Sequence, residues 1–202
     1  MPANSRFNFR TPSKTLKSPG GNNADRIGNA QVKATVEEVI ADIRQRGDKA
    51  VREYSEKFDN HSADSYLLSS ADIDEVMARV PKQVIDDITF VQTQVRGFAQ
   101  HQQASLKDFE VETHPGVFLG QKNVPIESTG AYIPGGKYPL LASAHMTIVT
   151  AKVAGVKRVV ACTPLIKGEM PDATIAAMKL AGADEIYILG GIQAIAAMAI
   201  GT

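Results

Sequence analysis

The chain has 202 residues, of which 44% are hydrophobic and 22% charged, so it is neither a collagen-like nor a disordered sequence. Its 22 basic side chains equal its 22 acidic ones, and no net charge attracts nucleic acid or an acidic membrane. The single cysteine, Cys162, excludes a disulfide scaffold and favours a reducing compartment. Without a signal peptide's apolar core or an apolar run of roughly 18 residues, the sequence predicts a cytoplasmic protein with no membrane partner.

The first 29 residues predict a flexible arm. Three prolines and the run Gly20-Gly21-Asn22-Asn23 interrupt them, and basic residues dominate the charged ones. This composition favours turns over a packed element. An arm that packs on a partner subunit is the alternative interpretation.

Residues 30–105 predict an α-helical block, because their apolar residues recur with a helical period. Gly47 ends the first helix, and the second runs over 48–58 and buries Val51, Tyr54 and Phe58. Ser70 caps the third helix and Pro81 opens the fourth. The inward stripe of the fourth helix consists of Val84, Ile88, Val91, Val95 and Phe98.

Residues 106–129 predict a β-hairpin and a connection. Apolar and polar residues alternate on both sides of His114-Pro115-Gly116, which has the composition of a turn. His114 lies at the tip, where we expect a solvated side chain and no ligand.

Residues 130–202 predict half of a Rossmann-like domain. Three short apolar strands, at 131–133, 156–162 and 185–189, alternate with helices at 140–154, 171–181 and 192–200. A β-α-β-α-β-α order gives a parallel sheet with right-handed crossovers. Three strands make a thin sheet with an exposed edge, so we expect a fragment or a chain that needs a partner. The fold class is therefore α/β: a helical block and a hairpin, then an incomplete parallel sheet.

Ligands of such sheets bind at the carboxyl ends of the strands. Here those ends carry residues 132–139, Thr163-Pro164 and residues 190–193, all rich in glycine, proline or polar residues. The first loop is not a Walker loop, since Tyr138 follows Lys137 where serine or threonine is required, and the G-x-G-x-x-G fingerprint is absent. Lys137 could hold an anion, and His145 could bring an imidazole to the same edge; a solvated lysine and a helix-surface histidine are the alternatives. The four histidines show no metal-ligand spacing.

At these loops the sequence resembles the histidinol dehydrogenase family. The matching stretches, in order and spacing, are Gly130-Ala-Tyr-Ile-Pro-Gly-Gly136, Ala151-Lys-Val-Ala-Gly-Val-Lys157, Cys162-Thr-Pro164 and Leu189-Gly-Gly-Ile-Gln-Ala-Ile-Ala-Ala197. The resemblance covers residues 30–202. It implies a zinc- and NAD-dependent dehydrogenase that oxidises a primary alcohol to an aldehyde and then to a carboxylate, with two hydride transfers.

The resemblance also implies roles for individual residues. Tyr132 and Gln193 match the family's NAD-contacting tyrosine and glutamine, and Pro134 and Pro164 line the same groove. Core packing for Tyr132 and a helix cap for Gln193 are the alternatives. The family's catalytic Glu-His pair and zinc ligands follow this region in longer members, so the resemblance implies no catalytic residue and no zinc ligand in this chain. It also implies a homodimer for the full-length enzyme.

The substrate is predicted from the segment after the glycine loop, Lys137-Tyr-Pro-Leu-Leu-Ala-Ser-Ala-His-Met146. It departs from the Y-P-S-S-V-L-M-N pattern of histidine-biosynthetic members and resembles the branch that oxidises 2,3-dihydroxypropane-1-sulfonate. A sulfonate favours cationic or N–H donors, which Lys137 and His145 could supply. L-histidinol is the alternative substrate. A truncated, catalytically inactive binding module is the alternative class, and an unrelated nucleoside-phosphate enzyme a third.

Overall fold

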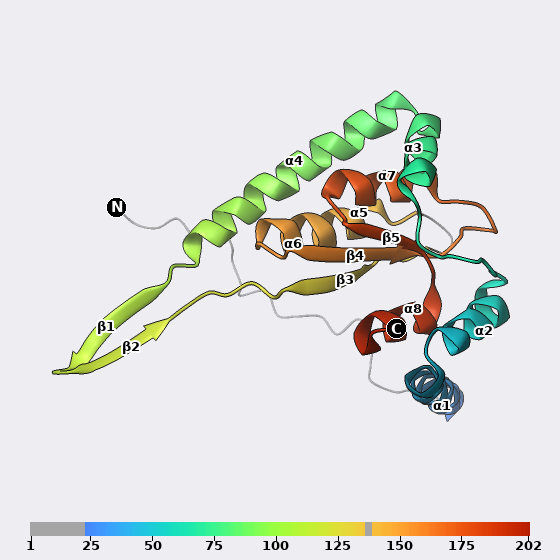
Figure 1. Cartoon of the computed structure of the whole chain (residues 1–202), viewed down its shortest axis with the longest axis horizontal. Helices are drawn as coiled ribbons and strands as arrows, with labels where there is room; N and C mark the ends of the chain where they lie inside the picture. Colours follow the sequence, from blue (N-terminus) through green and yellow to red (C-terminus); the bar gives the residue numbers. More distant parts are fainter. Residues whose placement is uncertain (1–22, 136–138) are drawn as a thin grey trace. The chain divides into compact units, whose positions relative to one another are not determined.

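The computed structural model describes residues 23–135 and 139–202. It divides the chain into two compact units, Met1–Val36 and Glu37–Thr202. The described part of the first unit is helical and continues into the second (Figure 1). The elements in chain order are α1 (Asn23–Arg46), α2 (Asp48–Asp59), α3 (Ser70–Arg79), α4 (Lys82–Ser105), β1 (Phe109–His114), β2 (Val117–Gln121), β3 (Ser128–Tyr132), α5 (Leu141–Ala144), the π-helical segment η1 (His145–Val149), α6 (Thr150–Val153), β4 (Arg158–Thr163), α7 (Asp172–Ala181), β5 (Glu185–Ile188) and α8 (Gly191–Ile200).

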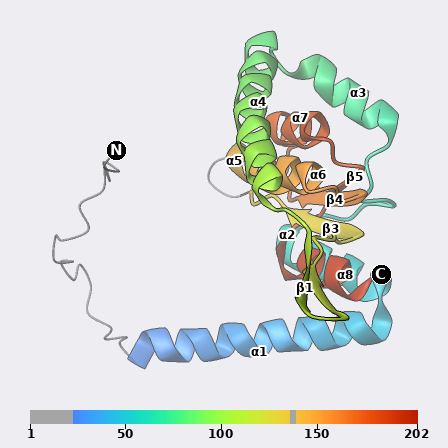
Figure 2. The ribbon, with the colours of Figure 1, turned by 90° about the vertical axis from the view of Figure 1, so that its left-hand side faces the viewer.

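The predicted α/β fold class is confirmed: a hairpin of β1 and β2 precedes a parallel sheet in the order β3-β4-β5. In the second unit, α5, η1, α6 and α7 cover one face of the sheet, with α4 outside them (Figures 1 and 2). On the other face α8 contacts β3, and α2 packs on α8. The helical block therefore packs on the helices that cover the two faces of the sheet. Each face has its own apolar cluster, one around Ile148 and Ile175 and one around Val39, Ile43 and Ala194.

Several helix boundaries differ from the sequence-based expectation. The first helix begins at Asn23, within the segment predicted as a flexible arm. Ala24 and Arg26 are residues of high intrinsic helix propensity, so the sequence there is compatible with a helix. The cap of α3 is Ser69, one residue earlier than predicted. Its hydroxyl accepts from the Asp72 backbone N–H at 3.2 Å, and the Asp72 carboxylate accepts from the Ser69 N–H at 2.8 Å.

The predicted apolar stripes are correct only in part. On α4, Ile88 is buried, but Phe98 is 67% exposed and Val91 40% exposed. Gln92 faces inward on this helix, where its Nε2 donates to the Ala177 carbonyl oxygen at 2.8 Å. Phe58 of α2 is also half exposed and stacks on Tyr54 with ring centroids 5.5 Å apart. Apolar periodicity missed Gln92 because a buried amide with a bonding partner satisfies the interior as well as a methyl group.

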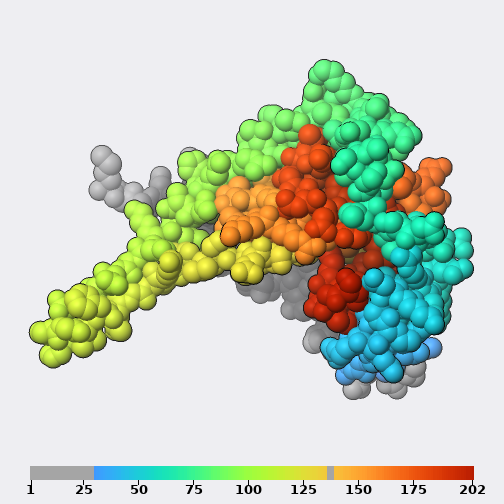
Figure 3. Space-filling model, viewed as in Figure 1, coloured from blue at the N-terminus to red at the C-terminus, as the bar shows by residue number. Residues whose placement is uncertain are grey.

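The predicted hairpin is confirmed, and its strands pair with Val111 opposite Leu119. All its residues are exposed, and Figure 3 shows it extending from the rest of the second unit. His114 ends β1 before the turn, as predicted. The sheet has an additional partner that the sequence pattern did not reveal. Leu67 forms an antiparallel bridge with Tyr187 of β5, so the segment before α3 pairs along the outer side of β5.

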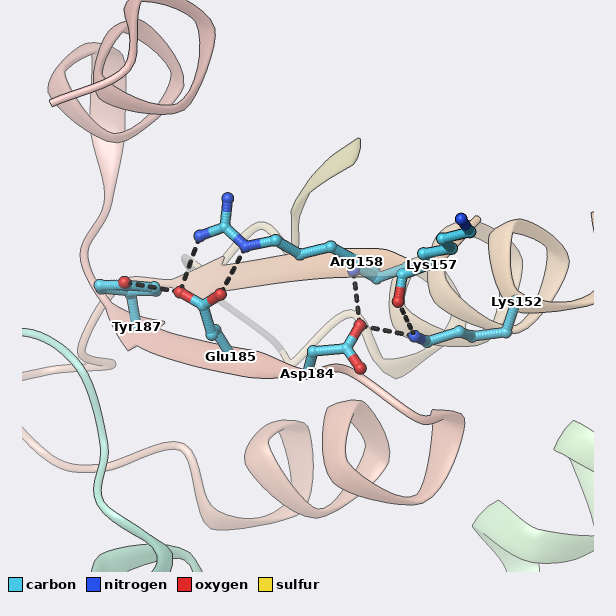
Figure 4. Close-up of polar contacts among 7 residues, drawn as sticks. Lys152, Lys157, Arg158, Asp184, Glu185 and Tyr187 are labelled. Carbon is cyan, nitrogen blue, oxygen red and sulfur yellow. Dashed lines mark hydrogen bonds and ion pairs between the residues drawn. The ribbon is translucent and has the colours of Figure 1, made fainter. Parts of the chain in front are cut away.

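The amino-terminal edge of the sheet carries a network of charged side chains (Figure 4). Asp184 accepts from Lys152 Nζ at 2.5 Å and from the Val159 backbone N–H at 2.6 Å. Glu185 accepts from Arg158 at 2.6 and 3.0 Å, and Tyr187 donates to the same carboxylate at 2.9 Å. These contacts fix the starts of β4 and β5 and leave the opposite, carboxyl edge for the glycine-rich loops.

Candidate functional site

The carboxyl edge brings together the loops that the sequence singled out. Tyr132 of β3 pairs with Cys162 of β4, which pairs with Tyr187 of β5, so the three strands end at one level. Ile133 and Leu189 each continue the pairing by one backbone hydrogen bond to β4. Pro134, Pro164 and the glycine pair Gly190-Gly191 therefore follow neighbouring strand ends. This juxtaposition of Tyr132, Pro134, Pro164 and Gln193 was the expectation from strand order.

Tyr132 is tied to the start of α8. Its hydroxyl oxygen accepts from the Gly191 backbone N–H at 3.2 Å, across 59 positions of sequence. Burial raises the pKa of this phenol, and the Gly191 N–H offsets part of the rise. The ring is half-buried and packs against the apolar cluster that includes Leu189. Tyr132 is therefore part of the core and also borders the carboxyl edge.

Pro164 lies between two glycines. A Cβ on Gly135 would lie 2.7 Å from Pro164 Cγ, and a Cβ on Gly190 would lie 2.5 Å from Pro164 Cβ. Real Cβ atoms do not approach carbon so closely, so only glycine fits at both positions. The close packing of the three loops thus depends on two residues without side chains.

Gln193 lies in the first turn of α8 and is fully buried. Its Nε2 donates to Asp59 Oδ2 at 2.7 Å, while its Oε1 has no hydrogen-bond partner within the described residues. Thr163 Oγ1 and His61 Nε2 are also buried and unpartnered there. Buried polar atoms are nearly always bonded, so these unpartnered atoms mark positions where a ligand or water would supply the missing hydrogen bond.

Asp59 is the site residue that the sequence analysis missed. It ends α2, where Asn60 adopts a left-handed conformation with φ of 49° and terminates the helix. Burial raises the pKa of the Asp59 carboxyl, and the hydrogen bond from Gln193 partly lowers it. A left-handed asparagine after an aspartate at a helix end was the available signal, but it predicts a turn and no partner 134 residues away.

The two residues proposed for the substrate have different outcomes. Lys137 lies outside the described residues. His145 is buried between helices, and its Nδ1 lies 3.2 Å from Gln92 Nε2 of α4. Burial lowers its pKa, which favours the neutral imidazole. His145 faces α4 at the start of η1. It therefore lies neither on a solvated helix surface nor at the carboxyl edge, the two positions that the sequence offered.

Cys162 has the position expected of an inert thiol. It is buried in β4, and burial raises its pKa to about 12.

No group of three or more potential metal ligands occurs within residues 23–135 and 139–202. The described helices include none long and apolar enough to cross a membrane. A cavity of about 400 Å³ lies between α2, α8, residues 64–67 and the sheet, and Cys162 and Leu189 are among its lining residues. The loop chemistry, rather than cavity size, therefore identifies the carboxyl edge as the candidate site.

Comparison with known proteins decides the family. The family model described as histidinol dehydrogenase matches residues 23–202. The chain belongs to the histidinol dehydrogenase family. The predicted resemblance is therefore confirmed, and members of this family are dehydrogenases. Among its relatives, a histidinol dehydrogenase homolog of Shouchella clausii is 58% identical over 174 residues, which cover 86% of this chain and 41% of that protein.

Two further relatives of this family member carry names with different substrates. A sulfopropanediol 3-dehydrogenase of Ruegeria pomeroyi is 43% identical, covering 85% of this chain and 40% of the relative. A histidinol dehydrogenase of Methanosarcina mazei is 40% identical, with coverage of 87% and 40%. The crystal structure of histidinol dehydrogenase from Elizabethkingia anophelis matches with a TM-score of 0.78 at 34% identity, covering 85% of this chain and 39% of that one. The chain thus spans about two fifths of the length of these relatives.

Proposed function

We propose that this chain forms the NAD-binding part of a dehydrogenase that oxidises a primary alcohol to a carboxylate through an aldehyde. When bound, NAD supplies the hydride acceptor, one molecule for each of the two successive oxidations. The observation that carries the proposal is the buried, unpartnered Oε1 of Gln193, which lies next to Gly191 at the carboxyl edge, where the Gly191 N–H bonds to the Tyr132 hydroxyl and Pro164 packs against Gly190. An acceptor, an aromatic wall and two prolines suit a planar heterocycle with exocyclic N–H groups.

In this proposal the residues of this chain bind and orient the cofactor, and none of them transfers a proton or coordinates zinc. Tyr132 and Gln193 contact the cofactor, with Pro134 and Pro164 beside them. In this proposal zinc is held by other parts of the full-length enzyme, as the family resemblance implies. We assign the full-length protein to the cytoplasm and to a homodimer, as the family resemblance implies.

The cofactor proposal is tested by calorimetric titration of the chain with NAD. We expect binding by the native chain and a loss of about tenfold or more in Tyr132→Ala and Gln193→Ala, since each removes a contact and exposes its neighbours. Gln83→Ala is the matched control, because Gln83 lies on the exposed side of α4, and we expect it to leave NAD binding unchanged. No binding by a folded native chain, confirmed by its melting curve, contradicts the proposal and favours a module without cofactor.

For the substrate we propose 2,3-dihydroxypropane-1-sulfonate, with L-histidinol as the second candidate. The segment after the glycine loop and the 43% identity to the Ruegeria relative support the first. The 40% identity to the Methanosarcina relative supports the second. NADH formation by the longest form of the protein, assayed with both alcohols, discriminates them. Histidinol oxidation without sulfonate oxidation overturns the first candidate.

A further inference from the structure

Asp59 and Gln193 form a polar pair between two helices, in which Gln193 is buried and Asp59 partly buried. Asp59 is the last residue of α2 and Gln193 lies in the first turn of α8, and these helices pack together. The contact between them is a single hydrogen bond from Gln193 Nε2 to Asp59 Oδ2, 2.7 Å long. Asp59 Oδ2 would also lie 3.1 Å from a Cβ on Gly190, so the carboxylate is held directly beside the glycine pair.

A side-chain amide can face a neighbour with either its oxygen or its nitrogen. A carboxylate is an acceptor only, so beside Asp59 the amide must present its NH₂ group. The planar amide then directs Oε1 away from Asp59, where it lies 2.7 Å from the position of a Cβ on Gly191. Gly191 has φ of +66° and no side chain, and the oxygen is left buried without a partner among the described residues.

We propose that Asp59 is a positioning residue that fixes the Gln193 amide with Oε1 toward the ligand, so that this position accepts a hydrogen bond and cannot donate one. The inference rests on the proposed cofactor function. It specifies that the group of NAD at this point is a donor, such as the exocyclic amino group of the adenine or the carboxamide NH₂. Asp59 itself contacts no ligand and acts through Gln193.

A double-mutant cycle on NAD binding tests this coupling. Asp59→Leu and Gln193→Leu are each expected to weaken binding about tenfold, which is the scale of one hydrogen bond to a buried group. The double variant is expected to bind no more weakly than either single variant, because both remove the same oriented acceptor. Asp59→Asn keeps an acceptor for Nε2 and is expected to stay within about threefold of the native chain.

An exchange of donor and acceptor makes the test specific for orientation. Gln193→Glu places two carboxylates side by side and is expected to weaken binding about tenfold or more. Adding Asp59→Asn to Gln193→Glu restores a donor beside Glu and keeps an acceptor oxygen toward the ligand, so binding is expected to recover. A merely structural role of Asp59 predicts that binding is lost and regained only together with the melting temperature, so melting curves of the same variants are the control. This pair also remains informative if Asp59→Leu does not fold.

The exposed pair Gln83 and Asp87 on α4 is the matched control. Its amide donates to the carboxylate at 2.9 Å, and the same substitutions there are expected to leave NAD binding unchanged. If the native chain binds NAD but the losses in Asp59→Leu and Gln193→Leu add, or if the exchanged pair does not recover, the positioning role is overturned and the cofactor function stands. If the folded native chain does not bind NAD, both proposals fail.

Discussion

Close backbone approach at single residues sets the geometry of the candidate site. Gly190 has an ordinary extended conformation, so its requirement for glycine comes from its neighbours and not from backbone strain. Its missing Cβ makes room for Pro164 and for the Asp59 carboxylate at the same time. One side-chain-free residue therefore allows α2, β4 and α8 to meet.

Gly190→Ala is expected to destabilise the chain by about 1–3 kcal/mol, because the added Cβ would overlap Pro164 and force the loops apart. Urea unfolding measures the change. Gly97→Ala on α4 is the control, since nothing lies within 4 Å of its added Cβ, and alanine there is expected to stabilise by up to about 1 kcal/mol. Equal effects of the two substitutions contradict the packing argument.

The amino-terminal edge of the sheet is held by contacts between elements. Asp184 lies just before β5 and joins it to α6 through Lys152 and to β4 through the Val159 N–H. Burial raises the pKa of the Asp184 carboxyl, but the bonds from Lys152 and Val159 outweigh it and leave the pKa lowered. This carboxylate therefore aligns the starts of two strands (Figure 4).

Asp184→Ala is expected to cost about 1–2 kcal/mol of unfolding free energy, because it leaves the Val159 N–H without its acceptor and the Lys152 ammonium with the Lys157 carbonyl oxygen alone. Chemical denaturation monitored by circular dichroism checks this. Asp86→Ala, which removes a partner of Lys82 on the exposed side of α4, is the comparison and is expected to change stability far less. An equally small effect at Asp184 speaks against its role in alignment.

For the second unit as a whole, stability depends on carboxylates that link distant elements. Arg79 of α3 bonds to Asp172 of α7 and holds its pKa below the ordinary value, and Arg158 does the same for Glu185. A carboxyl whose folded pKa is depressed stabilises the fold above its unfolded pKa. That contribution disappears as the pH falls through the folded pKa. The unit is therefore expected to lose stability progressively below about pH 4.5.

Glu185→Gln is expected to reduce the loss of stability between pH 6 and pH 3, since the substituted side chain no longer titrates. Urea midpoints measured across that range give the slope. Glu110→Gln in the exposed hairpin is the control and is expected to leave the slope close to that of the native chain. An unchanged slope in Glu185→Gln shows that other carboxylates control acid unfolding.

The sequence by itself determined the order and type of the elements and the loops that meet at the carboxyl edge of the sheet, the candidate site. Apolar periodicity and turn chemistry are local properties, and a parallel sheet necessarily aligns its strand ends. Only the tertiary structure decided the partners: Asp59 for Gln193, Gln92 for His145, and Leu67 for the β5 edge. Each pair joins residues from separate elements, and its energy comes from burial and hydrogen bonding across long sequence separations. Such a contact leaves no pattern among residues that are neighbours in the sequence.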